Sequence, residues 1–189
     1  MTLTGSSTLR QVVEAVSRVL AAHRIRAVLT GGACASVHSR GDYLSQDLDY
    51  IIQSRVTRAE LDAALATVGF IRDGASYIHP QSPFFVEFPA GPLAIGDDDL
   101  VEPVVVRVGR GSVLCLSPTD SCRDRLAAFY HWNDRQSLDV AVRIACRQRV
   151  SLGAIAAWSL REGQTEKHRE FVDAVSGARK ARRRSTRGR

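Results

Sequence analysis

Several features that point to particular classes of protein are scarce or missing in this sequence. No apolar run approaches the roughly 20 residues needed to span a bilayer, and residues 1–7 lack the charged and then apolar layout of a secretory signal. We therefore expect a cytoplasmic protein with no membrane partner. The four cysteines contain no C-x-x-C pair, so the sequence indicates neither a zinc site nor a disulfide framework.

Lysine is nearly absent, and the basic residues are unevenly spread. Only Lys167 and Lys180 are lysines among the 26 basic residues. Residues 179–189 hold seven of the 26 and no acidic residue, so the remaining 19 are balanced by 20 acidic residues, although the net charge is +6. We interpret 179–189 as a disordered basic tail, which either binds a polyanion through phosphate contacts or is simply solvated.

The composition and the order of the segments predict one globular α+β protein. At 189 residues, 44% hydrophobic and 24% charged, the chain can bury a single core. Periodicity and start and stop signals predict a mixed β-sheet of about five or six strands flanked by helices, and a helical C-terminal portion. The predicted parts are an α/β core over 1–116, a helical portion packed on it over 117–178, and the tail over 179–189.

Within this core, two short polar patterns each adjoin an apolar run. Gly31 and Gly32 follow a predicted strand over 26–30 and precede a helix-compatible segment, where backbone amides and the helix dipole can hold an anion. Asp47 and Asp49 open a second predicted strand over 47–52, and alternation along a strand places both carboxylates on one face. Such a pair suits Mg²⁺, which takes oxygen ligands and shares them with substrate phosphates. The alternative is a turn and a strand edge with two solvated aspartates.

The order and spacing of Gly31, Gly32, Asp47 and Asp49 resemble the signature of the nucleotidyltransferase superfamily, which has the DNA polymerase β-like fold. Ser45, together with Arg40, makes the chain look more like the AbiEii and MenT-type toxin branch. The resemblance implies that Asp47 and Asp49 hold Mg²⁺, and that the glycine pair and Ser45 bind the triphosphate of an NTP.

The third carboxylate of this superfamily comes from a neighbouring strand. Glu87 lies inside the apolar run 84–88, where an acid without a partner is costly to bury. The resemblance makes Glu87 the residue that helps to remove a proton from the attacking hydroxyl. Asp97, Asp98 and Asp99, in a turn-rich loop, are the rival carboxylates. A solvated edge glutamate is the non-functional alternative.

Residues 120–139 resemble a later motif of the toxin branch. Arg125 stands where that motif has a lysine, which implies a role in neutralising triphosphate charge, and Asp139 stands at its closing aspartate, which implies a catalytic role. Without the resemblance, Arg125 and Asp139 would be read as surface residues that pair with each other or with water.

The resemblance implies a Mg²⁺-dependent transfer of NMP from an NTP to an acceptor hydroxyl. For the toxin branch, the acceptor would be the 3′ end of tRNA, and a protein antitoxin would silence the enzyme. A small cationic acceptor such as an aminoglycoside, a protein acceptor, and a catalytically silent nucleotide-binding module are the alternatives.

Overall fold

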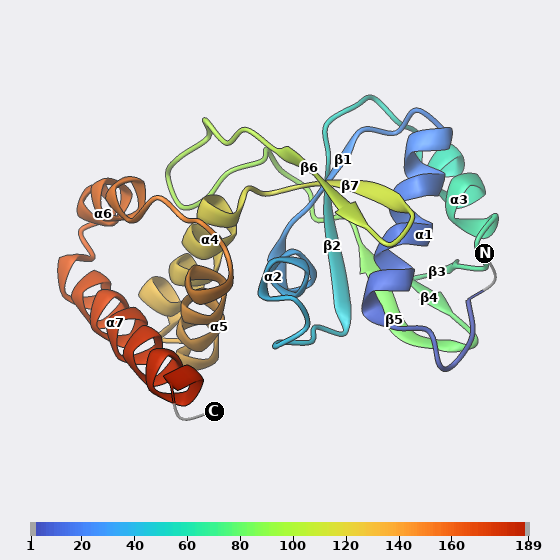
Figure 1. Cartoon of the computed structure of the whole chain (residues 1–189). Coiled ribbons are helices and arrows are strands. Elements are labelled where there is room, and N and C mark those ends of the chain that lie inside the picture. The colour runs from blue at the N-terminus through green and yellow to red at the C-terminus, as the bar shows by residue number, and fades with distance from the viewer. Residues whose placement is uncertain (1–2, 188–189) are drawn as a thin grey trace.

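The structure, a computed structural model, describes residues 3–187 and contains one seven-stranded mixed sheet (Figure 1). The strand order is β3-β4-β5-β2-β1-β7-β6, in which β2 pairs with β5 and β1 with β7 in parallel, and the other neighbours are antiparallel. The strands are β1 Ala27–Leu29, β2 Asp47–Ile52, β3 Ile71–Asp73, β4 Ser76–His79, β5 Ser82–Glu87, β6 Val104–Val108 and β7 Gly111–Cys115.

Seven helices are present in the described part of the chain. They are α1 Leu9–Ala22, α2 Gly31–Ser39, α3 Arg58–Ala66, α4 Pro118–Trp132, α5 Arg135–Arg147, α6 Leu152–Arg161 and α7 Thr165–Arg187. In Figure 1, α4 to α7 form a lobe beside the sheet, and α2 lies between this helical lobe and β2. The predicted α+β architecture, with helices flanking a mixed sheet and a helical C-terminal portion, is confirmed.

Capping side chains define where the helices begin. Thr8 and Thr57 each accept a hydrogen bond from a backbone N–H three residues on, and the side chains of Gln11 and Glu60 bond back to the cap, which completes two capping boxes. Ser117 caps α4 in the same way, directly before a proline at the first helical position.

Burial alternates strictly along the start of β2. Leu48 and Tyr50 are buried on the face that carries α1, where the Tyr50 hydroxyl lies 2.9 Å from the Ser17 hydroxyl. Asp47 and Asp49 point the other way and are only half-buried. The predicted separation of the two carboxylates from the core is therefore confirmed.

The segment 120–139 spans two helices, because Asn133 adopts a left-handed conformation (φ 55°) that ends α4, and Asp134 then caps α5. Residues 179–187, predicted to be disordered, continue α7. Arg179 and Arg182 donate to the carbonyl oxygens of Ala145 and Cys146 at the end of α5, where the helix dipole favours cations. The last two residues of the predicted tail lie outside the described residues.

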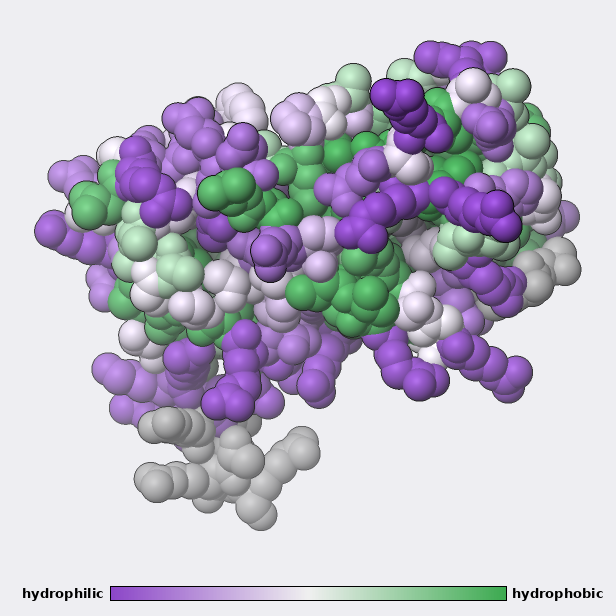
Figure 2. Space-filling view, turned by 90° about the horizontal axis from the view of Figure 1, so that it is seen from above, coloured by the Kyte–Doolittle hydropathy of each residue, from purple (hydrophilic) through white to green (hydrophobic). Residues whose placement is uncertain are grey.

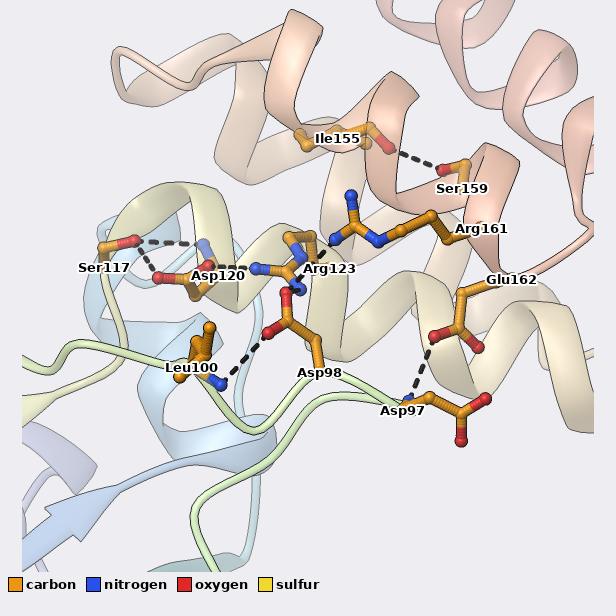
Figure 3. Close-up of polar contacts among 10 residues, drawn as sticks. All are labelled: Asp97, Asp98, Leu100, Ser117, Asp120, Arg123, Ile155, Ser159, Arg161 and Glu162. Atoms are coloured by element: carbon orange, nitrogen blue, oxygen red, sulfur yellow. Dashed lines mark hydrogen bonds and ion pairs between the residues drawn. The ribbon is translucent and has the colours of Figure 1, made fainter.

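The acidic loop, residues 89–100, lies between β5 and β6 in the chain and contacts the helical lobe (Figure 3). The Asp98 carboxylate pairs with Arg123 of α4 and, at 3.4 Å, with Arg161 of α6. The Glu162 carboxylate accepts a hydrogen bond from the backbone N–H of Asp97 at 3.1 Å. The loop is therefore attached to two helices that are distant from it in sequence.

On the face seen from above in Figure 2, hydrophilic side chains protrude around smaller hydrophobic patches. No helix among residues 3–187 combines the length and the apolar character that crossing a bilayer requires.

Candidate active site

The parallel pairing of β2 with β5, two interior strands, brings three carboxylates to one face of the sheet. Asp47 lies opposite Phe85, and Asp49 lies opposite Glu87, so Asp47, Asp49 and Glu87 share one face. The Ser76 hydroxyl on β4 donates to Glu87 Oε1 at 2.6 Å and holds this side chain beside the pair. Glu87 thus occupies the position next to Asp49 on the neighbouring strand.

Gly31 and Gly32 begin α2 directly beside the aspartates. The backbone N–H of Thr30, the cap of α2, donates to the Asp49 carbonyl oxygen at 2.9 Å. Gly31 has φ +60°, and a Cβ there would overlap the Asp49 carboxylate, with the carboxylate carbon only 3.2 Å away. At Gly32, a Cβ would lie 2.9 Å from the Cβ of Ser45. Glycine is therefore required at both positions. The N–H groups at the start of α2, which have no partner within the helix, lie next to the carboxylates.

Ser45 lies between the two predicted elements. Its buried hydroxyl donates to Asp47 Oδ1, and the same hydroxyl lies against Gly32. Ser45 therefore connects the aspartate strand to the glycine turn.

Arg125 approaches the carboxylates from α4. Its guanidinium pairs with Asp124 at 2.8 Å and is largely buried. Burial opposes the charge of Arg125, but Asp124, Tyr43 and Asp49 together raise its pKa above the ordinary value. Arg125 therefore supplies a permanent positive charge near Asp49. Its partner Asp124 was not predicted from the sequence, where adjacent opposite charges are common.

The charges in the site perturb Asp49 strongly. Burial, and then the negative charges of Asp47 and Glu87, raise the pKa of the Asp49 carboxyl from 3.8 to about 6, against the opposing effect of Arg125. A carboxylate held in this way gains from a nearby cation, because the cation removes the repulsion from its neighbours.

Asp139 lies on α5, a different element from those that carry the three carboxylates. It is exposed and lines a cavity of about 370 Å³ with Tyr43, Gln136 and Arg143. Tyr43 connects this cavity to the site, since its hydroxyl would lie 3.2 Å from a Cβ on Gly32.

Two further sequence candidates lie elsewhere. Arg40 ends α2, at the opposite end of the helix from the glycine pair, in a left-handed conformation. Asp98 forms ion pairs with Arg123 and Arg161, and the backbone N–H of Asp97 donates to Glu162. These contacts attach the acidic loop to the helical lobe (Figure 3). Glu87, and not the acidic loop, adjoins the aspartate pair.

In the described chain, one group of three or more potential metal ligands has all its ligand atoms within 4.8 Å of one another, and this group is Cys34, His38 and Cys115. The carboxylate oxygens of Asp47, Asp49 and Glu87 are more widely spaced than this. The cysteine and histidine group was not predicted from the sequence. Cys34 and His38 are four residues apart, but Cys115 is at least 77 residues from either of them.

Two solved structures are similar to this chain. One is the crystal structure of an antigenic nucleotidyltransferase-like protein from Paracoccidioides brasiliensis, with a TM-score of 0.57 and 17% identity, over 75% of this chain and 77% of that one. The other is the solution structure of the antibiotic-resistance factor ANT(2'')-Ia, with a TM-score of 0.48 and 14% identity, over 95% and 97% of the two chains. No protein-family model and no curated protein matches the sequence. The first of these structures shows that the chain has a nucleotidyltransferase-like fold.

Proposed function

We propose that the protein is a nucleotidyltransferase that transfers NMP from an NTP to an acceptor hydroxyl. The observation that carries this proposal is the contact between the start of α2 and β2. A glycine turn with free N–H groups lies against Asp49, with Asp47 and Glu87 beside it. An anion site and a cluster of carboxylates in direct contact suit a metal-bound triphosphate.

Asp47 and Asp49 would hold Mg²⁺ in this enzyme. The fit rests on two carboxylates that share one face of β2, with Glu87 beside them on β5. Burial and the negative charges of Asp47 and Glu87 raise the pKa of Asp49, and a cation would offset these charges. When bound, Mg²⁺ would supply charge neutralisation for the triphosphate and for the leaving pyrophosphate. Asp49 lies against the glycine turn, so the ion would lie next to it.

The remaining residues of the site act on the substrate. The N–H groups of Gly31 and Gly32 bind triphosphate oxygens, and Ser45 orients Asp47 through its hydrogen bond. Arg125 offsets phosphate charge with a guanidinium that stays protonated.

Glu87 accepts the proton of the attacking hydroxyl, while the Ser76 hydroxyl holds its other oxygen. The acceptor oxygen then attacks the α-phosphorus, and the bond to pyrophosphate breaks. Asp139, on the rim formed by α5, would orient the nucleotide or the acceptor from the cavity next to Tyr43.

A nucleic acid is the acceptor that the surface charge favours, and the 3′ end of tRNA is our specific proposal. Arg10, Arg40 and Arg107 line a cavity of about 450 Å³ with no acidic residue in its described lining. None of these three arginines forms an ion pair within residues 3–187. A small cationic acceptor would need an acidic cleft, but Asp98 already pairs with two arginines. Three unpaired arginines suit a phosphate backbone.

The direct test is to incubate purified protein with Mg²⁺, total tRNA and each α-labelled NTP in turn. Asp49→Asn is the inactive variant, and Asp99→Asn, an exposed carboxylate of the acidic loop, is the matched control. Label on tRNA with the wild type and Asp99→Asn, but not with Asp49→Asn, would support the proposal and identify the nucleotide. Absence of NTP binding would refute nucleotidyl transfer, and NTP binding without labelled RNA would refute only the tRNA acceptor.

We further propose that the enzyme acts in the cytoplasm as the toxin of a toxin–antitoxin pair. Blocking the 3′ end of tRNA would stop aminoacylation, so expression should arrest growth. A co-expressed antitoxin protein should restore growth and co-purify with the chain. Growth arrest by the Asp49→Asn variant would contradict a catalytic origin of the toxicity.

A further inference from the structure

A second cluster of potential metal ligands lies at the other side of α2, away from the carboxylates. Cys34 and His38 are one helical turn apart on α2, and Cys115 is the last residue of β7. The three side chains are 0%, 2% and 0% exposed, and their ligand atoms all lie within 4.8 Å of one another. The fold therefore assembles two thiols and an imidazole in a sealed position.

The spacing of these atoms suits a tetrahedral ion. Cys115 Sγ lies 3.9 Å from His38 Nε2. Zinc bonds of about 2.3 Å to sulfur and 2.0–2.1 Å to nitrogen give ligand separations of roughly 3.3–3.8 Å in a tetrahedron. The Leu116 carbonyl oxygen accepts a hydrogen bond from His38 Nε2 at 2.8 Å and lies 3.8 Å from Cys34 Sγ, so it is a polar atom next to two of the ligand atoms. Its distance from Nε2 is shorter than the edge of such a tetrahedron, so this hydrogen bond must open by roughly 0.5 Å to admit an ion.

We propose that Cys34, His38 and Cys115 bind one structural Zn²⁺, with the Leu116 carbonyl oxygen closing the fourth position. Two thiolates offset the charge of the ion, so the complete site is neutral and can be buried without an uncompensated charge. Formation of the site releases the two thiol protons. The ion replaces the hydrogen bond from His38 Nε2 to the Leu116 carbonyl oxygen, so Nε2 gives its lone pair to the ion and the ring proton moves to Nδ1.

Such an ion would join α2 to β7. The helix that carries Cys34 and His38 begins with Gly31 and Gly32, so the ion would fix the helix that presents the proposed phosphate-binding turn. His38 also lines the cavity that contains Arg10 and Arg107. Because all three ligand side chains are buried, the site would be loaded during folding and would exchange slowly afterwards.

Metal analysis of protein refolded with Zn²⁺ and then desalted tests the site. The wild type should retain about one zinc per chain, as a closed structural site does. Cys34→Ala and Cys115→Ala should lose it. Cys122→Ala is the matched control, because Cys122 is equally buried but contacts the Ala141 carbonyl oxygen and lies outside the cluster. Washing with excess Mg²⁺ removes metal held only by carboxylates.

Refolding of the wild type with Co²⁺ gives a spectrum that is informative by itself, even where a variant fails to fold. Thiolate-bound tetrahedral Co²⁺ should produce sulfur-to-metal charge-transfer absorption and intense visible bands, both absent from Cys34→Ala. Wild-type protein that retains no zinc and shows no such absorption would overturn the proposal. Equal retention of zinc by the wild type and by Cys34→Ala would overturn it as well. Neither readout depends on nucleotidyl transfer.

Discussion

At the scale of single residues, burial and neighbouring negative charges act together on the Asp49 carboxyl. The pKa of Asp49 is raised to about 6 by burial and by its neighbours Asp47 and Glu87. A carboxyl with this pKa is mostly ionised at neutral pH but becomes protonated in mild acid. Both the affinity for a metal and the stability of the protein should therefore depend on pH through the protonation of Asp49.

The affinity for Mg²⁺ should fall as the pH is lowered through about 6, because the proton on Asp49 competes with the metal. For one competing proton, the dissociation constant rises roughly tenfold for each pH unit below that value. Isothermal titration calorimetry of the protein with Mg²⁺ and a non-hydrolysable NTP, repeated at several pH values between 5 and 8, measures this dissociation constant. A flat profile would show that Asp49 does not hold the metal.

Stability of the metal-free protein should show the opposite trend. The folded state binds the Asp49 proton more tightly than the unfolded state, so this stabilisation is complete below pH 3.8 and is lost as the pH rises to about 6. Asp49→Asn should remove this contribution. Urea unfolding of both proteins across that range, in the presence of EDTA, should give curves that diverge as the pH rises, with the variant the more stable.

Gly31→Ala should impair both folding and activity. The residue has φ +60°, and its new Cβ would displace the Asp49 carboxylate. We expect a loss of about 1–2 kcal/mol in the free energy of unfolding from the backbone alone, and at least a tenfold loss of kcat/KM. Gly153→Ala, in α6 with no atom within 4 Å of the new Cβ, should be neutral or slightly stabilising. Urea unfolding and the labelling assay measure the two effects.

At the scale of secondary-structure elements, the acidic loop acts as a strap between the sheet and the helical lobe. Arg123 is only 9% exposed and pairs with both Asp98 and Asp120, while its guanidinium lies 5.2 Å from the centre of the Trp158 ring. A buried arginine needs these acids, because an uncompensated charge in the interior is costly.

Asp98→Ala should reduce the free energy of unfolding by roughly 1–3 kcal/mol, since Arg123 loses one partner but keeps Asp120. Asp99→Ala, one residue away and exposed, should change it by less than about 0.5 kcal/mol. Chemical denaturation of the two variants beside the wild type gives the comparison. Equal stabilities would show that the loop is not a strap.

At the scale of the whole molecule, two kinds of charge lie at opposite ends of α2. The carboxylates adjoin its first residues, and the arginine cavity surrounds its last. The helix has nine residues and is therefore about 13 Å long. An acceptor strand could engage both ends at once.

Replacing Arg10, Arg40 and Arg107 together by glutamine should raise KM for tRNA without changing KM for the NTP. The salt dependence of tRNA binding should become less steep by roughly 2–3 on a log–log plot, because three phosphate contacts are removed. The same change at Arg18, Arg55 and Arg169 removes equal charge outside this cavity and is the control. Equal effects of the two triple variants would show that only net charge matters.

The sequence by itself was sufficient for the features that depend on neighbours in the chain. Alternation predicted that Asp47 and Asp49 share a face, and cap residues predicted the starts of α1, α3 and α4, because these properties involve only a few consecutive residues. Strands β3 and β4 were not predicted, because they are too short to show a pattern of alternating apolar residues. The apolar residue of β3, Ile71, is 55% exposed, so this strand has no buried face that such a pattern would mark.

Only the tertiary structure decided which distant residues meet. The parallel pairing of β2 with β5 put Glu87 beside Asp49, whereas the acidic loop was drawn to Arg123 instead. Likewise, Arg179 and Arg182 of α7 donate to the last carbonyl groups of α5, which attaches this part of the helix to the lobe. Composition predicted disorder for that segment, because the charge of a side chain says nothing about which carbonyl groups the fold places within its reach.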